Sequence, residues 1–197
     1  MVDNTFTIKK NISFIYKLLL KYYDSIKRAL KLRFCGMIKY DMKTNTLQKI
    51  DNSYGIENNW ITYDREKRLL YLAQTFDKNI KMFKLNEKGE VEKCVKNIPT
   101  EYGWDNLFFD NKKKLVYADL LGNLKISFDY YDPTKNIPRD KIYAGLAVYD
   151  PYKSEEPIYT FLQNDFMIEV THGFMKYDNI YLSSAIYIGI LKCKKLE

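Results

Sequence analysis

The sequence predicts an all-β fold in which a partial β-propeller of three to four blades follows a short N-terminal amphipathic helix. Short apolar segments alternate with turn signals from residue 34 onward. A group of strands also recurs, because Asp64 and Asp110 lie 46 residues apart, as do Tyr71 and Tyr117. A period near 45 residues with about four strands per unit is typical of propeller blades. Strands and turns alone fit a β-sandwich equally well.

The composition is that of a folded globular chain. Of the 197 residues, 46% are hydrophobic and 16% aromatic, and only three are cysteine. These values exclude a disordered chain and a disulfide-dense small domain. The net charge of +7 raises the question of nucleic-acid binding. Lysine outnumbers arginine 27 to 5, however, and arginine is the residue that clamps phosphates and reads bases. We therefore expect no nucleic-acid partner.

Residues 1–33 form an N-terminal extension that is predicted to carry a helix. Apolar residues recur every three or four positions from Ile12 to Leu30, with basic residues between them. Such a helix packs on its own domain, which is the simpler expectation, or lies on a membrane surface or protein partner. Neither a signal peptide nor a transmembrane segment is visible, since Phe14–Leu20 is short and interrupted by Lys17. The localisation stays open.

Residues 34–197 form the predicted propeller-like unit. Its strand segments share aromatic and aliphatic residues bounded by turn formers. They are Gly36–Tyr40, Leu69–Ala73, Ile80–Leu85, Leu115–Ala118, Leu124–Phe128, Ile180–Ser184 and Tyr187–Lys192, and the repeat adds strands at 60–64 and 106–110. Turns are expected at 41–45, 86–89, 112–114 and 121–123.

The repeat also places polar side chains at corresponding positions. Asn58 and Asn59 precede one strand, and Asp105 and Asn106 precede the equivalent strand of the next unit. In a propeller these entering loops face the central channel, so the side chains converge. Amide and carboxylate oxygens are the ligands of calcium, which takes about six to eight. Asn and Asp also favour turns by bonding their own backbone, so the pattern alone indicates either turn formers or metal ligands.

Several segments carry a resemblance to a known family. They are Met37–Asp41, Asn59–Ile61, Trp104–Asp110, Leu124–Asp132 and Tyr177–Cys193. Asn59-Trp60-Ile61 stands where the family has Asn-Gly-Ile, and Trp104–Asp110 is similar to its Val-Asp-Asn-Ile-Ser-Val-Asp. In order and spacing, these segments resemble the C-terminal half of the paraoxonase/arylesterase family, calcium-dependent lactonases and esterases on six-bladed β-propellers.

The resemblance implies functional positions. Asn59 matches an asparagine that binds the catalytic calcium, and Asp105 and Asn106 match an aspartate–asparagine pair on the same ion. Calcium at such a site polarises an ester or lactone carbonyl and stabilises the oxyanion. His172 falls near a wall of the substrate pocket, although a packed or surface histidine is the plainer interpretation. Cys193 matches a family cysteine whose disulfide partner lies in a region without a counterpart here.

Other family features are missing. The family's remaining calcium ligands and its general-base histidines lie in the other half, Leu120 stands where a further histidine falls, and Trp60 replaces a glycine. Three ligands do not complete a calcium site. The resemblance therefore implies that the full-length relatives hydrolyse aryl esters or lactones with calcium. We expect this activity to be impaired in the present chain. On this interpretation the chain is a fragment or a short isoform. The alternative is a non-enzymatic, paraoxonase-like accessory or chaperone-like protein. A carbohydrate- or protein-binding propeller unrelated to esterases is disfavoured by the Asp105-Asn106 match.

Overall fold

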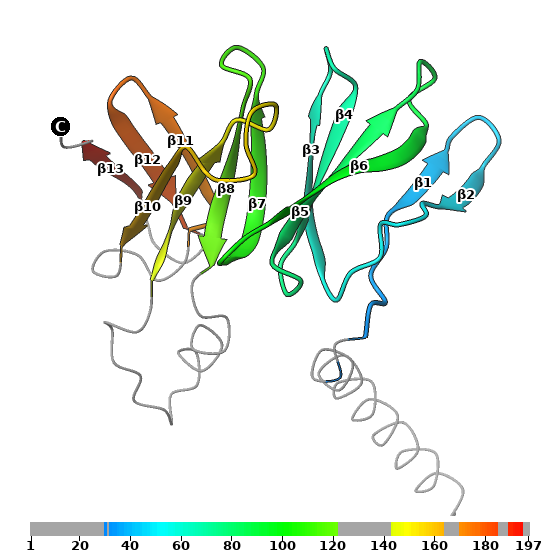
Figure 1. Ribbon diagram of the computed structural model, residues 1–197, viewed down its shortest axis with the longest axis horizontal. Coiled ribbons are helices and arrows are strands. Elements are labelled where there is room, and N and C mark those ends of the chain that lie inside the picture. The colour runs from blue at the N-terminus through cyan, green and yellow to red at the C-terminus, as the bar shows by residue number, and fades with distance from the viewer. Residues whose placement is uncertain (1–29, 31, 122–142, 164–169, 185–188, 195–197) are drawn as a thin grey trace, which may run out of the picture.

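The computed structural model describes residues 30, 32–121, 143–163, 170–184 and 189–194. These residues form thirteen β-strands in four antiparallel sheets and no helix (Figure 1). The all-β class is therefore confirmed. The predicted N-terminal helix lies outside the described residues except at its end, where residues 32 and 33 are not helical. Within the described ranges, no helix is long and apolar enough to cross a membrane.

In each sheet, strands that follow one another in the sequence are hydrogen-bonded neighbours. The N-terminal hairpin consists of β1 (Ile38–Asp41) and β2 (Thr46–Lys49). The first sheet consists of β3 (Asn58–Asp64), β4 (Leu69–Gln74), β5 (Asn79–Leu85) and β6 (Val91–Pro99). The second sheet consists of β7 (Gly103–Asp110), β8 (Leu115–Leu121), β9 (Ala144–Tyr149) and β10 (Tyr159–Gln163). The third sheet consists of β11 (His172–Lys176), β12 (Asn179–Ser183) and β13 (Ile190–Lys194).

The 46-residue repeat is present in the strand pairing itself. β3 pairs with β4, and β7 with β8, in the same register, so that Asp64 faces Leu69 and Asp110 faces Leu115. A β-bulge interrupts both pairs at the same place, at residues 58–61 in β3 and 104–107 in β7. A bulge leaves extra residues unpaired and redirects their side chains. The first two units are thus structural copies, bulge included.

Aspartates close the corresponding turns with the same hydrogen bonds. Oδ1 of Asp64 accepts from the backbone N–H groups two and three residues further on, at 3.0 and 3.2 Å. Oδ1 of Asp110 does the same at 2.8 and 3.1 Å. Arg68 and Lys114 then adopt positive φ angles of 52° and 61°, which turn the chain into the next strand. The predicted turn at 112–114 is therefore confirmed.

Two apolar layers join the three larger sheets. Between the first and second sheets, Tyr71 stacks on Phe109 with ring centroids 5.7 Å apart, and Trp104 meets Tyr149 edge-on at 5.5 Å. The second layer lies between the second and third sheets. Its buried members are Tyr117, Ala144, Leu146, Val148, Val170, Ile180 and Leu182. Burial of aromatic and aliphatic surface fixes the sheets side by side, as Figure 1 shows.

The strand predictions were incomplete. Five of the predicted strands lie within β3, β4, β5, β7 and β8, while Gly36–Tyr40 and Ile180–Ser184 overlap β1 and β12 with shifted ends. The structure adds β2, β6, β9, β10 and β11, which we did not predict. β2 is exposed at every residue, so its sequence has no apolar face to reveal it. The predicted strand Leu124–Phe128 lies outside the described residues, and Tyr187–Lys192 overlaps β13 only from Ile190.

Candidate functional site

The two β-bulges bring the three predicted calcium ligands together. Asn59 lies in the bulge of β3, and Asp105 and Asn106 lie in the bulge of β7. These two strands contact each other across the junction of the first and second sheets. The side chains of Asp105 and Asn106 are half-buried, while Asn59 is exposed. We call these three residues the bulge cluster.

Hydrogen bonds hold the bulge cluster together and tie it to the third sheet. Asn59 Nδ2 donates to Asp105 Oδ1 at 2.6 Å, which joins residues 46 positions apart. Asn106 Nδ2 donates to Asp105 Oδ2 at 3.1 Å and to the Thr171 carbonyl at 2.5 Å. Both oxygens of Asp105 are thus oriented by amides, one from each bulge. The cluster links all three of the larger sheets at one place.

A fourth polar residue, Asp119, belongs to this region and was not predicted. It lies on β8 between Ala118 and Leu120, whose partners Leu107 and Trp104 flank the bulge of β7. The side chain is buried, and Oδ1 has no hydrogen-bond partner among the described residues. Burial, and then the nearby Asp105 carboxylate, raise the pKa of Asp119 well above its usual range, while the Gly173 N–H bonds the carboxylate and lowers it. The available signal was an acid inside the apolar segment 115–121.

An apolar groove of about 340 Å³ runs beside Asn59. Its walls are formed by Gly36, Met37, Asn58, Asn59, Trp60, Ile61 and Leu72. Trp60 is one of these wall residues, and it is 48% exposed. Binding sites for small molecules commonly combine an apolar wall with a few polar groups. The groove offers both within one short stretch of β3.

The donors present suit a hard cation. No group of three or more His, Cys, Asp or Glu side chains that could hold a metal ion occurs in the described part of the chain. A cation at the bulge cluster would be bound by carboxylate, amide and carbonyl oxygens, which calcium prefers and zinc does not. The unpaired, buried Asp119 Oδ1 is the acceptor that such an ion would satisfy. The types of oxygen donor present at the bulge cluster are those that calcium binds.

The other predicted residues lie at the third sheet. His172 follows Thr171 directly and is exposed, with its ring 5.9 Å from Phe108 and 6.4 Å from Phe174. It therefore stands beside the bulge cluster, and its place in a substrate wall stays a prediction. Cys193 lies half-buried on β13 as a free thiol whose pKa is raised by burial. Cys35 and Cys94 are also free.

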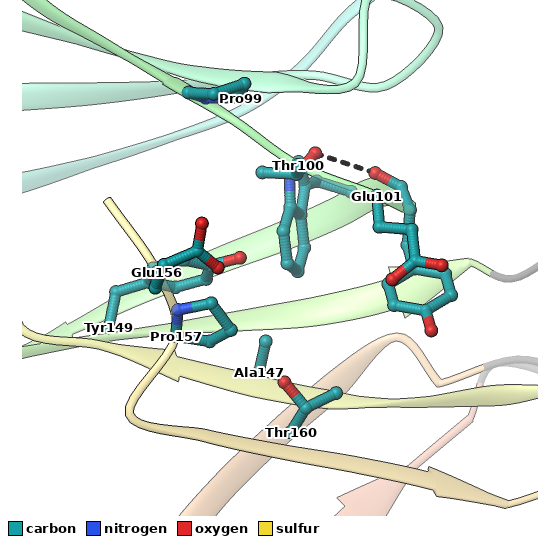
Figure 2. Close-up of a pocket in the computed structure, with 10 residues that line it drawn as sticks. Pro99, Thr100, Glu101, Ala147, Tyr149, Glu156, Pro157 and Thr160 are labelled. Atoms are coloured by element: carbon teal, nitrogen blue, oxygen red, sulfur yellow. Dashed lines mark hydrogen bonds between the residues drawn. The ribbon is translucent and has the colours of Figure 1, made fainter. Parts of the chain in front are cut away.

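A second cavity of about 420 Å³ lies away from the bulge cluster, between the end of β6 and strands β9 and β10 (Figure 2). Aromatic rings of Tyr102, Trp104 and Tyr149 line it together with Glu101 and Glu156. On one side, the Thr100 hydroxyl donates to the Tyr102 carbonyl at 2.8 Å. None of the residues predicted for the site lines this cavity, so it is a separate feature of the molecule.

Comparison with known proteins assigns no family. No family model matches the chain, and no curated protein matches it. A solved structure from Bacteroides uniformis, assigned as a 6-phosphogluconolactonase, is similar at 9% sequence identity and a TM-score of 0.40, covering 82% of this chain and 61% of that one. The extracellular domain of a protein from B. thetaiotaomicron, assigned as a one-component system, matches at 14% identity and a TM-score of 0.21, covering 84% and 34%. The chain thus spans less than two thirds of either protein, and similarity at this level assigns no activity.

Proposed function

We propose that this chain is a calcium-binding partial β-propeller of the paraoxonase/arylesterase type, with one side of an ester- or lactone-binding site. The observation that carries the proposal is the Asn59–Asp105 hydrogen bond at 2.6 Å. It joins equivalent positions of two repeat units, and those are the positions at which the resembling family binds calcium. An oriented carboxylate flanked by two amides supplies the kinds of oxygen that a calcium site uses.

The sheet order supports successive propeller blades. Each four-stranded sheet is an antiparallel meander, and the sheets follow one another in sequence order. Their first strands are neighbours in space, since β3 contacts β7 and β7 contacts β11. In a propeller, the first strand of each blade lines the central channel. The bulges of β3 and β7 would then present their polar side chains to that channel.

Each residue of the bulge cluster has a role in this proposal. Asp105 supplies negative charge, and the amides of Asn59 and Asn106 fix the direction of its two oxygens. The bond from Asn106 to Thr171 holds the third sheet against the same point. When bound, calcium supplies Lewis-acid polarisation of a carbonyl and stabilisation of an oxyanion.

The apolar groove would bind the acyl or aryl group of the substrate. Met37, Trp60 and Ile61 line it beside Asn59. An exposed indole offers a flat surface for an aromatic ring, and such contacts contribute about 0.5–1.5 kcal/mol beyond area burial. The proposal uses the Asp105 carboxylate as a cation ligand, so it assigns cation and substrate binding to the bulge cluster and the groove. Hydrolysis needs a further group, for which His172 is a candidate.

The test is a calorimetric calcium titration of the purified chain, with phenyl-ester hydrolysis followed in the same buffer. We expect binding in the micromolar range and at least ~tenfold weaker binding for Asp105→Ala. Asp51→Ala is the control, because Asp51 is exposed in the turn after β2. Calcium-dependent turnover lost in Asp105→Ala supports the hydrolase, and binding without turnover favours the accessory protein. Absence of calcium binding by the wild-type chain overturns the proposal.

A further inference from the structure

Asp119 is a buried carboxylate that the fold leaves partly unpaired. Its side chain belongs to a residue only 2% exposed, and Oδ1 has no hydrogen-bond partner among the described residues. Buried polar groups in folded proteins are nearly always paired, since desolvation without compensation costs free energy. Asn79 Oδ1 and Trp104 Nε1 also lack a partner among the described residues, but Asp119 Oδ1 belongs to an ionisable group opposite the bulge of β7, where a cation can complete it.

The surroundings of Asp119 are apolar on one side and polar on the other. Gly173 on β11 packs against it, so closely that a Cβ at that position would lie 3.0 Å from Asp119 Oδ1 and 2.9 Å from both Leu146 and Leu182. The polar side is the bulge of β7, which lies opposite Asp119 on the neighbouring strand. The bulge cluster is therefore where a compensating group can approach.

No side chain of the described residues bonds Asp119 Oδ1. Protonation would neutralise the carboxylate, but it would add an O–H donor that needs a partner of its own. A cation with several oxygen ligands satisfies the orphan oxygen without needing an acceptor.

We propose that Asp119 is a further ligand of the cation that binds at the bulge cluster, so that the site contains two carboxylates. The inference rests on the proposed function and deepens it. Asp105 and Asp119 together match the charge of a divalent cation, and the amide oxygens of Asn59 and Asn106 are available types of donor beside them. Asp119 thereby adds one of the further oxygen ligands that a calcium site needs beyond Asn59, Asp105 and Asn106.

The proposal predicts a change of sign in the stability of Asp119 variants. Without calcium, Asp119→Asn and Asp119→Leu remove a buried carboxyl group with an unpaired oxygen, so their melting temperatures should equal or exceed that of the wild type. With saturating calcium, the wild type should gain several degrees through ligand binding, and the variants should gain little. Calcium affinity measured by calorimetry should fall at least ~tenfold in both variants. The melting scans are run in EGTA and in calcium chloride.

Asp64→Asn is the matched control. Asp64 is fully buried but bonds the backbone of Glu66 and Lys67 and the Tyr152 hydroxyl. Its loss should lower the melting temperature equally with and without calcium. An Asp119 variant that behaves like this control, or that binds calcium as tightly as the wild type, overturns the inference and leaves the proposed function intact. A wild-type chain that does not bind calcium overturns both. Asp119→Leu keeps the test decisive if Asp119→Asn does not fold.

Discussion

The first and second sheets share a scaffold and differ in their buried polar groups. In the first sheet, the buried Gln74 Nε2 donates to Asn58 Oδ1 at 2.7 Å and to the Ser53 carbonyl at 3.1 Å. Asn58 in turn donates to the carbonyls of Ser53 and Cys35, both at 3.0 Å. This network is closed, and it fastens the segment that leads from the N-terminal hairpin onto the sheet.

The second sheet replaces that network with apolar side chains. Trp104 and Leu120 occupy the positions equivalent to Asn58 and Gln74, and both are fully buried. The buried polar residue of this sheet is Asp119, at the position equivalent to Ala73, and its Oδ1 is unpaired among the described residues. The repeat therefore supplies strands, bulges and turns. The exchange of a closed network for an open carboxylate is what makes the second sheet a candidate binding site.

Exchanging Trp104 for its counterpart, Trp104→Asn, should have the largest effect on stability. Trp104 is 1% exposed and packs edge-on against Tyr149 in the layer between the two sheets. Truncation of a buried Trp costs about 3–5 kcal/mol from lost burial and the cavity left behind, and the buried amide adds to this loss. Urea unfolding measures the change. Trp60→Asn, at an exposed site, should cost under about 1 kcal/mol, so equal losses for the two variants would contradict the comparison.

The opposite exchange, Gln74→Leu, should have an intermediate effect. The leucine that suits the second sheet would leave Asn58 Oδ1 and the Ser53 carbonyl with fewer donors in the first. The expected loss is about 1–3 kcal/mol in the free energy of unfolding, measured in urea. In contrast, Asp119→Leu measured without calcium should leave the free energy of unfolding unchanged or raise it. Two losses of similar size would show that the polar groups of both sheets are structural.

The shared scaffold could be predicted because short-range rules determine it. Asp64 and Asp110 sit at turns for which their side chains are well suited, and the 46-residue spacing survives as strand register. The same spacing correctly brought Asn59, Asp105 and Asn106 to one place. The position of these residues along the repeat was therefore sufficient to predict that their side chains lie close together.

The missing parts of the prediction depend on long-range contacts. The local sequence offers only one signal for Asp119, an acid inside the apolar segment 115–121, because its isolation follows from the packing of β8 against Gly173 and β9. β6 is mostly exposed and alternates weakly, so its strand state depends on pairing with β5. Tertiary context decides such segments.

A contact between equivalent turns of the two sheets should have the smallest effect. Lys114 Nζ donates to Glu66 Oε2 at 2.5 Å, linking the turn after β7 to the turn after β3. Glu66 is 64% exposed, so water and salt screen the pair. We expect Glu66→Gln to leave the melting temperature almost unchanged at physiological salt.

The stabilisation from the Lys114–Glu66 pair should depend on pH in a defined direction. The hydrogen bond to Glu66 raises the pKa of Lys114 above its usual value. A raised lysine pKa means that the stabilisation is fully present below the unfolded-state pKa, about 10.4, and is lost as the pH rises through the folded-state value. Any difference in melting temperature between wild type and Glu66→Gln should therefore be greatest at neutral pH and low salt, and vanish at strongly alkaline pH. A large difference that persists in 1 M salt would mean that the turns clamp the two sheets together, and that the scaffold shared by the sheets is held at its rim as well as in its core.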